Sequence, residues 1–243
     1  MSKNKINRKS SVDKSKEILR KNESKAKIIG FKCNIKFEAL NDQQKLVLDT
    51  IDKNKITIIY GPPGVGKTYL AVLYGLKAFL QRKYEKLVFT RPCIEAFGEK
   101  LGFLPGDYND KIEPYMLPII NTLKNHLEEG FLKKMIDHED IMTLPFAFMR
   151  GITAERSFVV ADEIQNTIPE QVKLLLTRIG KGTKIVLTGD LGQVDRDRVR
   201  ENGLQDAIVR LRDVKDIGIV EMDIDSLVRD PIIKYIEEKY KNI

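Results

Sequence analysis

An α/β fold, in which a parallel sheet carries helices on both faces, is predicted by three observations. From residue 37 onward, short apolar runs of strand length alternate with stretches of helical periodicity, which is the pattern of parallel strands joined by crossover helices. A glycine-rich loop connects the first apolar run to a helix. The chain has 243 residues, of which 42% are hydrophobic, enough to bury one sizeable core. We therefore expect one folded domain.

Each element of this fold has its own signal along the chain. Five apolar runs predict strands, at residues 56–60, 87–90, 158–161, 184–188 and 217–222. Helical periodicity predicts helices over residues 42–52, 67–81, 111–129, 169–179 and 204–212, with a last one near 226–240. Residues 144–151 either add a short strand or form a plain connection. The sequence contains no internal repeat.

The segment 91–118 interrupts this alternation. It contains seven Gly and Pro residues in 28 positions, too many for a simple connection from a strand to a helix. We expect a long structured loop that ends in the helix beginning near Lys111. Long loops within compact domains are uncommon and often functional.

The excess positive charge lies at the amino terminus. Residues 1–27 contain ten of the 42 Lys and Arg and three of the 35 Asp and Glu, which leaves 32 of each sign in the rest of the chain. We predict a flexible basic tail at 1–27, a lead-in segment at 28–37 and a domain at 38–243. The tail is either a phosphate-binding arm or only a solubilising one.

The same composition bears on the cellular location. No apolar core of a secretory signal and no run of about 18 apolar residues is present, so we expect a cytoplasmic protein without membrane contact. Cys33 and Cys93 stand 60 positions apart without a partner motif. Neither a disulfide framework nor a zinc site is expected.

The glycine-rich loop matches a phosphate-binding motif. Its residues, GPPGVGKT, fit the pattern G-x-x-x-x-G-K-[ST] and follow a strand. The glycines let backbone N–H groups approach the phosphates, and the helix start adds partial positive charge. Lys67 is expected to bridge the β- and γ-phosphates, and the Thr68 hydroxyl to bind Mg²⁺. We assign ATP to a site made of Gly61, Pro62, Pro63, Gly64, Val65, Gly66, Lys67, Thr68 and Tyr69.

A second acidic motif supplies the rest of the predicted chemistry. The apolar run 158–161 is followed by Asp162, which we expect to hold the metal, and Glu163, the expected general base. Taken alone, such a motif is often only a strand that runs into a helix cap. Gln193 follows the strand at 184–188 and is placed to sense the γ-phosphate, because its amide can donate and accept.

Two more glutamines fit the same site. Gln165 lies three residues after Asp162, and Gln44 lies in the helix that precedes the first strand. Gln44 is placed to read the adenine edge. Considered singly, these glutamines are typical of solvated surface.

These residues together resemble the PhoH family of P-loop ATPases, whose core is similar to the RecA-like domain of superfamily one helicases. The resemblance covers residues 38–240 and is carried by GPPGVGKTYLAV, RPCIEAFGEKLGFLPGD, DKIEPYMLP, FMRG, VVADEIQNT, LLLTRIGKGTKIVLTGDLGQVD and SLVRD. It implies a RecA-like P-loop fold, ATPase activity coupled to RNA or single-stranded DNA, and a homo-oligomer, namely a hexameric ring.

The residues named so far lack one group that P-loop enzymes use in catalysis. P-loop enzymes bring an arginine to the γ-phosphate, and in two-core helicases a second domain supplies it. We expect a neighbouring subunit to supply it here, with Arg178 and Arg229 as the leading candidates and Arg150, Arg196 and Arg198 behind them. Each is equally compatible with a surface salt bridge. The alternative function is a nucleotide-switched oligomeric regulatory module without motor activity.

Overall fold

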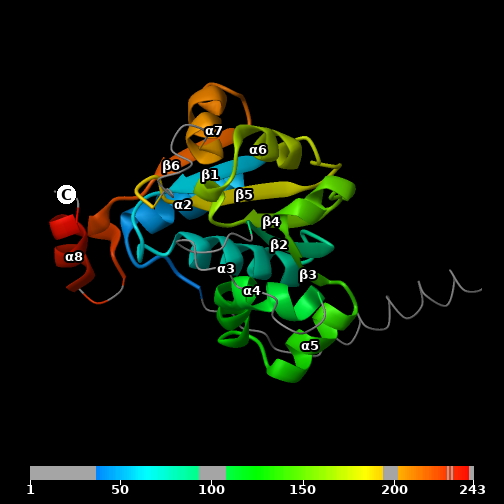
Figure 1. Ribbon diagram of the computed structural model, residues 1–243. Coiled ribbons are helices and arrows are strands. Elements are labelled where there is room, and N and C mark those ends of the chain that lie inside the picture. Colours follow the sequence, from blue (N-terminus) through cyan, green and yellow to red (C-terminus); the bar gives the residue numbers. More distant parts are fainter. Residues whose placement is uncertain (1–36, 93–107, 194–201, 229, 231, 241–243) are drawn as a thin grey trace, which may run out of the picture. The chain divides into compact units, whose positions relative to one another are not determined.

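Six parallel strands form the centre of the fold (Figure 1). The computed structural model describes residues 37–92, 108–193, 202–228, 230 and 232–240. The strands lie in the order β3-β2-β4-β5-β1-β6. Their bounds are β1 Ile56–Tyr60, β2 Lys86–Arg91, β3 Ile141–Pro145, β4 Ser157–Ala161, β5 Lys184–Gly189 and β6 Ile217–Glu221. This parallel sheet confirms the predicted fold class.

Helices cover both faces of the sheet. The α-helices of the described residues are α2 Asp42–Lys53, α3 Lys67–Leu80, α4 Tyr108–Lys124, α5 Glu129–Asp137, α6 Pro169–Leu176, α7 Gly203–Leu211 and α8 Ile232–Tyr240. Figure 1 shows α3 and α4 on one face and α6 and α7 on the other. Strand side chains such as Ile185 and Leu187 pack against Val172 and Leu204 of the second layer. Every strand side chain of β4 is buried, as expected for a strand inside a parallel sheet.

Local sequence signals start several of these helices. The Asn41 side chain accepts a hydrogen bond from the backbone N–H of Gln44 and caps α2. Asn202 caps α7 in the same way, and α6 begins at Pro169, whose missing N–H costs nothing in a first turn. Because these caps satisfy otherwise orphaned donors, the helix starts lie within one residue of their predicted positions.

The edge strand β3 was not among the five predicted strands. The segment 144–151 forms the end of β3 and then a 3-10 helix at Phe146–Gly151, so neither expected alternative describes it fully. The strand is only partly buried in its middle, which leaves no continuous apolar run for sequence analysis to detect. Pro145 at its end suits an edge strand, where its missing N–H breaks no ladder.

Two helix predictions need correction. Residues 111–129 do not form one helix, because α4 ends at Lys124 and α5 starts after Glu128. Between them the helix ends in a turn, in which the His126 N–H bonds the Leu123 carbonyl, and the side chain of Leu127 is 5% exposed. The last helix begins at Ile232 instead of near 226, where a 3-10 turn, Ile224–Ser226, is capped by Asp223.

Some predicted features lie outside the described residues. These are the basic tail at 1–27, most of the lead-in segment, both cysteines and the 93–107 part of the long loop. Residues from Phe37 onward form one compact unit. Within the part of the chain that the structure describes, no helix is long and apolar enough to cross a membrane.

Candidate nucleotide-binding site

The glycine-rich loop leaves the carboxyl end of β1 and enters α3 directly. Gly64 and Gly66 have φ values of 83° and 94°, in the left-handed region that favours glycine. Gly61 is required for space, because a Cβ there would lie 2.1 Å from the backbone oxygen of Met222. The motif glycines therefore fix the course of the backbone that must approach the phosphates.

Lys67 is held inside this loop. Its Nζ donates hydrogen bonds of 2.7 Å to the carbonyl oxygens of Gly61 and Pro62. The ammonium group thus stays beside a cavity of about 740 Å³, a size typical of ligand pockets. The cavity is lined on the loop side by Pro63, Gly64, Gly66, Lys67, Thr68 and Tyr69.

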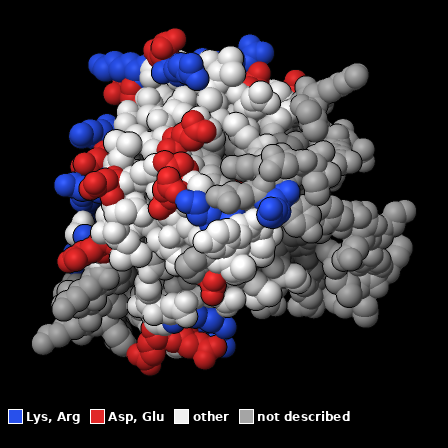
Figure 2. Space-filling model, turned by 90° about the vertical axis from the view of Figure 1, so that its left-hand side faces the viewer, with Lys and Arg blue, Asp and Glu red and all other residues white. Residues whose placement is uncertain are grey.

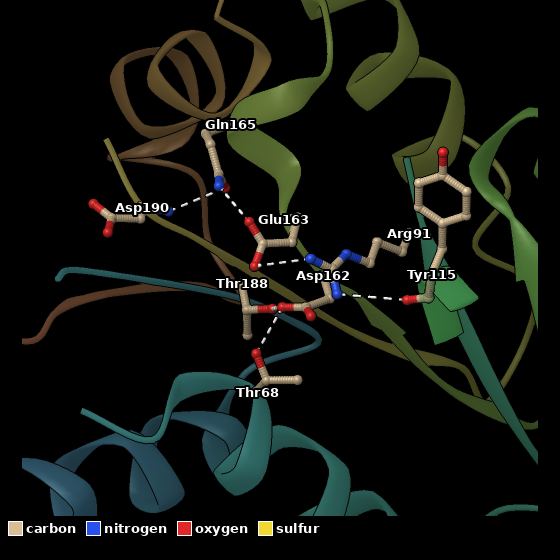
Figure 3. Close-up of polar contacts among 8 residues, drawn as sticks. All are labelled: Thr68, Arg91, Tyr115, Asp162, Glu163, Gln165, Thr188 and Asp190. Carbon is tan, nitrogen blue, oxygen red and sulfur yellow. Dashed lines mark hydrogen bonds and ion pairs between the residues drawn. The ribbon is translucent and has the colours of Figure 1, made fainter. Parts of the chain in front are cut away.

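Asp162 joins the loop to the centre of the sheet. Its Oδ1 accepts hydrogen bonds from the hydroxyls of Thr68, at 2.7 Å, and Thr188, at 2.6 Å (Figure 3). Asp162 is only 3% exposed, and its backbone N–H is bonded to the Thr90 carbonyl of β2. Magnesium prefers such hard oxygen donors and commonly takes one or two from the protein, so the Thr68 and Asp162 oxygens fit this metal.

Glu163 lies at the start of the turn after β4, in a left-handed backbone conformation with φ 57° and ψ 41°. Its Oε1 is 3.4 Å from Nη2 of Arg91, and its Oε2 accepts a 2.5 Å hydrogen bond from Nε2 of Gln165. A non-glycine residue in this region is strained, and such strain gathers at functional sites. The contacts with Arg91 and Gln165 hold the carboxylate in one place at the cavity wall.

The end of β5 and the loop that follows it line the same cavity. Gly189, Asp190 and Gln193 line it, and the Asp190 carboxylate accepts a 2.8 Å hydrogen bond from the Gly192 N–H. Gln165 also reaches this loop, since its Oε1 accepts a 3.1 Å hydrogen bond from the Asp190 N–H. Gln165 therefore links the ends of β4 and β5, as Figure 3 shows.

The chain matches the family described as PhoH-like protein over residues 36–241. It belongs to the PhoH family. It is 38% identical over 199 residues to a PhoH-like protein of Synechocystis sp., which covers 82% of this chain and 60% of that protein. It is also 38% identical over 197 residues to a PhoH-like protein of Bacillus subtilis, covering 81% of this chain and 61% of that protein. The chain thus spans about three fifths of the length of these curated relatives.

A solved structure supports the fold of this PhoH-family chain. The large terminase of a thermophilic bacteriophage superposes with a TM-score of 0.51, at 12% identity, over 83% of this chain and 50% of that one. At this identity the similarity concerns the fold alone. The two proteins therefore share this sheet architecture.

Most predicted PhoH site residues come together at the carboxyl ends of the strands. Lys67, Thr68, Asp162, Glu163 and Gln193 all line the same cavity. Tyr69 lines it too, and its hydroxyl lies 3.2 Å from Nε2 of His126. Val65 is fully buried and does not line the cavity.

Gln44 does not line this cavity. It is 3% exposed, its Oε1 accepts a 2.9 Å hydrogen bond from the Leu40 N–H, and its Nε2 lies against Gly66. Leu40, not Gln44, lines the cavity. In this arrangement Gln44 supports the loop, and reading of the adenine edge stays a prediction.

The two arginine candidates that the structure describes, Arg178 and Arg150, lie apart from the site. Arg178 precedes β5, where its carbonyl accepts a hydrogen bond from the Ala154 N–H, so it lies near the amino ends of the strands. Its Nε is buried without a hydrogen-bond partner among the described residues. Arg150 is exposed and does not line the cavity either. Arg196, Arg198 and Arg229 fall outside the described residues.

Sequence reasoning missed two residues of this site, Arg91 and Thr188. Both stand at the carboxyl ends of predicted strands, as Asp162 does. That shared position is the signal that could have found them, because the carboxyl ends of parallel strands meet at one edge, where ligands of open α/β sheets bind.

Proposed function

We propose that this chain binds ATP with Mg²⁺ and hydrolyses it to ADP and phosphate. The observation that carries the proposal is the hydrogen bond between Thr68 and Asp162, which joins the phosphate-binding loop to the acidic end of β4. Glu163 lines the same cavity, where it can meet a water molecule. A loop alone would support nucleotide binding, but the added carboxylate supports hydrolysis.

The residues have separate roles in this reaction. Backbone N–H groups of the loop and the ammonium of Lys67 bind the phosphates, and Thr68 and Asp162 would hold the metal. Magnesium held there would neutralise part of the negative charge of the phosphates. Glu163 accepts a proton from water while the water oxygen bonds to the γ-phosphorus and the bond to the β-phosphate oxygen breaks. Gln193 orients the water or the γ-phosphate by its amide.

Measurement of phosphate release tests this proposal. Wild-type protein should release phosphate from ATP in Mg²⁺ and lose this activity in EDTA. K67A should abolish nucleotide binding, whereas E163Q should bind ATP and turn over at least about 100-fold more slowly, since general-base catalysis contributes 10²–10⁴-fold. E170Q is the matched control, because Glu170 is an exposed carboxylate on α6. Equal phosphate release by wild-type protein and K67A would overturn the proposal.

We infer that hydrolysis is coupled to RNA or single-stranded DNA. The family resemblance and the basic composition of residues 1–27 support this inference. On the face in Figure 2, basic and acidic side chains are mixed, and no continuous basic patch is visible among the described residues. On this face the mixture favours the second candidate, a nucleotide-switched regulatory module.

Polynucleotide stimulation separates the two candidates. Several-fold faster hydrolysis with a polynucleotide supports coupling, and an unchanged rate supports the regulatory module. Removal of residues 1–27 should weaken RNA binding and flatten its dependence on salt, because each phosphate contact releases counterions. Binding that is unchanged at two salt concentrations would exclude the tail as the contact.

We further propose a ring-shaped homo-oligomer, hexameric by resemblance, in which a neighbouring subunit contributes an arginine to the site. The family resemblance supports this arrangement, and Arg178, which lies near the amino ends of the strands, could reach only the cavity of another subunit. R178A and R229A should lower turnover without loss of assembly, measured by light scattering. Full turnover in both variants would refute a role for either arginine.

A further inference from the structure

Glu163 is held by two partners of different kinds. Arg91, at the end of β2, faces Oε1 as an ion pair, and Gln165 donates to Oε2 as a neutral amide (Figure 3). A general base must accept a hydrogen bond from water, and both oxygens of this carboxylate already face nitrogen donors, Nη2 of Arg91 and Nε2 of Gln165. The observed pairing is therefore a resting arrangement of the base.

The two partners are not held equally. Gln165 is 1% exposed, contacts Glu163 at 2.5 Å and also binds the Asp190 N–H, so it is fixed on both sides. The Arg91 side chain is 24% exposed, and its Nη2 stands 3.4 Å from the carboxylate. Its Nη1 makes a long 3.5 Å contact with the Tyr115 carbonyl. Among the contacts between described residues, Arg91 is thus the more exposed and more distant of the two partners of Glu163.

The charges along the cavity favour a move of Arg91 away from Glu163. Of the described lining residues, Lys67 and Arg91 are the cations, and Asp162, Glu163 and Asp190 are the acids. A γ-phosphate that enters this cavity adds negative charge beside Glu163. A guanidinium binds phosphate through two parallel N–H groups, and the doubly charged phosphate attracts it more strongly than a single carboxylate does.

We propose that, when ATP enters, Arg91 leaves Glu163 and binds the γ-phosphate. A triphosphate, and not a diphosphate, therefore frees the Glu163 carboxylate to act as the base. The inference rests on the proposed ATP hydrolysis and assigns Arg91 as a catalytic residue within the chain. Gln165 keeps the freed carboxylate in place as a positioning residue. Arg91 also gives the transition state a positive charge from the same subunit.

Nucleotide affinity tests the exchange directly. We would measure Kd for ADP and for a non-hydrolysable ATP analogue, both with Mg²⁺. In wild-type protein the analogue should bind more tightly than ADP. R91A should reduce this preference by about tenfold and leave ADP affinity unchanged, because only the γ-phosphate contact is lost. R91K should restore part of the preference, since it keeps the charge but lacks the paired N–H groups.

The direction of the change in kcat separates the exchange from a competing explanation. If Arg91 only restrained Glu163, its removal would free the base, and R91A would raise kcat with unchanged analogue affinity. The exchange instead requires R91A to lower kcat as well as the preference for the analogue. R91Q serves as a second neutral variant that keeps a polar side chain, should R91A unfold. A raised kcat, or an unchanged preference in both neutral variants, overturns the proposal.

Two controls separate failure of the exchange from failure of the proposed function. R210A removes an exposed arginine that pairs with Asp206 on α7, away from the cavity, and should leave both affinities unchanged. Wild-type protein that neither binds nor hydrolyses ATP would refute the function itself. Wild-type hydrolysis that K67A abolishes, together with an unaltered preference in R91A and R91Q, would refute the exchange alone.

Discussion

Thr68 and Asp162 stand 94 positions apart in the sequence, yet their side chains share a 2.7 Å hydrogen bond. The same Asp162 oxygen also accepts the hydroxyl of Thr188. One carboxylate oxygen therefore ties α3, β4 and β5 together at the point where the phosphate-binding loop ends. The arrangement positions the proposed metal donors before any ligand enters, which reduces the reorganisation that binding requires.

The first prediction concerns the Thr68 hydroxyl. T68A removes both a proposed metal donor and the tie to Asp162, so turnover should fall about 100-fold. T68S keeps the hydroxyl and should retain most of the activity. Phosphate release measured across a Mg²⁺ titration checks both variants. Wild-type activity in T68A at low Mg²⁺ would contradict the assignment.

The second prediction concerns Thr188, which donates a hydrogen bond to Asp162 and is not one of the proposed metal donors. Its hydroxyl is fully buried and orients the carboxylate. T188V keeps the shape and removes the hydrogen bond, so the Mg²⁺ concentration for half-maximal turnover should rise about 10- to 100-fold. T188S is the matched control. A maximal rate lost without any change in the Mg²⁺ requirement would point instead to a packing defect.

The third prediction concerns the contact between α3 and β4. A Cβ on Gly75 would lie 2.5 Å from the ring of Phe158, which is fully buried. In G75A this overpacking should cost about 3 kcal/mol, against about 1 kcal/mol gained in helix propensity. The net loss of about 2 kcal/mol should appear in the free energy of unfolding measured with urea.

G130A is the matched comparison for this change. Nothing lies within 4 Å of the Cβ position of Gly130 in α5. The variant should gain about 0.4–1 kcal/mol, because alanine restricts the unfolded chain. If G75A and G130A changed stability alike, the close packing of α3 on β4 would have no energetic weight.

The fourth prediction is a pH dependence of stability that arises from Tyr74 and Asp52. The Tyr74 hydroxyl donates a 2.6 Å hydrogen bond to Asp52, and this bond lowers the pKa of the Asp52 carboxyl. A lowered carboxyl pKa stabilises the fold above about pH 4, and the contribution is lost as pH falls through the folded-state value. Burial, and then Asp52, raises the pKa of Tyr74, so its contribution is lost as pH rises above about 10.

Y74F should therefore flatten the stability curve at both ends. Urea midpoints from pH 3 to 11 give the curve for each protein. Some alkaline loss should remain, because burial also raises the pKa of Tyr84. A Y74F curve that is parallel to the wild-type curve throughout would show that the Tyr74–Asp52 hydrogen bond has no linkage to folding.

The parts of the site that the sequence predicted are those that lie in short, local sequence motifs. Lys67 and Thr68 follow from one short pattern, and Asp162 and Glu163 from the end of an apolar run. Strand β1 begins and ends where predicted, because buried parallel strands are continuous apolar runs. The edge strand β3 lacks that continuity and was missed.

The contacts that sequence could not supply depend on strand order. Arg91 meets Glu163 because β2 lies beside β4, and Thr188 meets Asp162 because β5 lies on the other side of β4. Periodicity identifies strands but does not order them. Gln44 illustrates the same limit, since its helix was predicted correctly while the direction of its amide, toward Leu40, depends on packing.

The last prediction separates the two glutamines of the site. Gln165 is buried and bonds both Glu163 and the Asp190 N–H, whereas Gln193 is exposed at the cavity rim. Q165L leaves a buried N–H without its acceptor, which should cost about 1–3 kcal/mol of unfolding free energy, and it should lower kcat because Glu163 loses its support. Q193A should lower kcat while unfolding free energy stays within about 0.5 kcal/mol of wild type. Urea denaturation and phosphate release on the same samples distinguish the two. If Q165L unfolded like wild type, the link between the ends of β4 and β5 would be too weak to position the base.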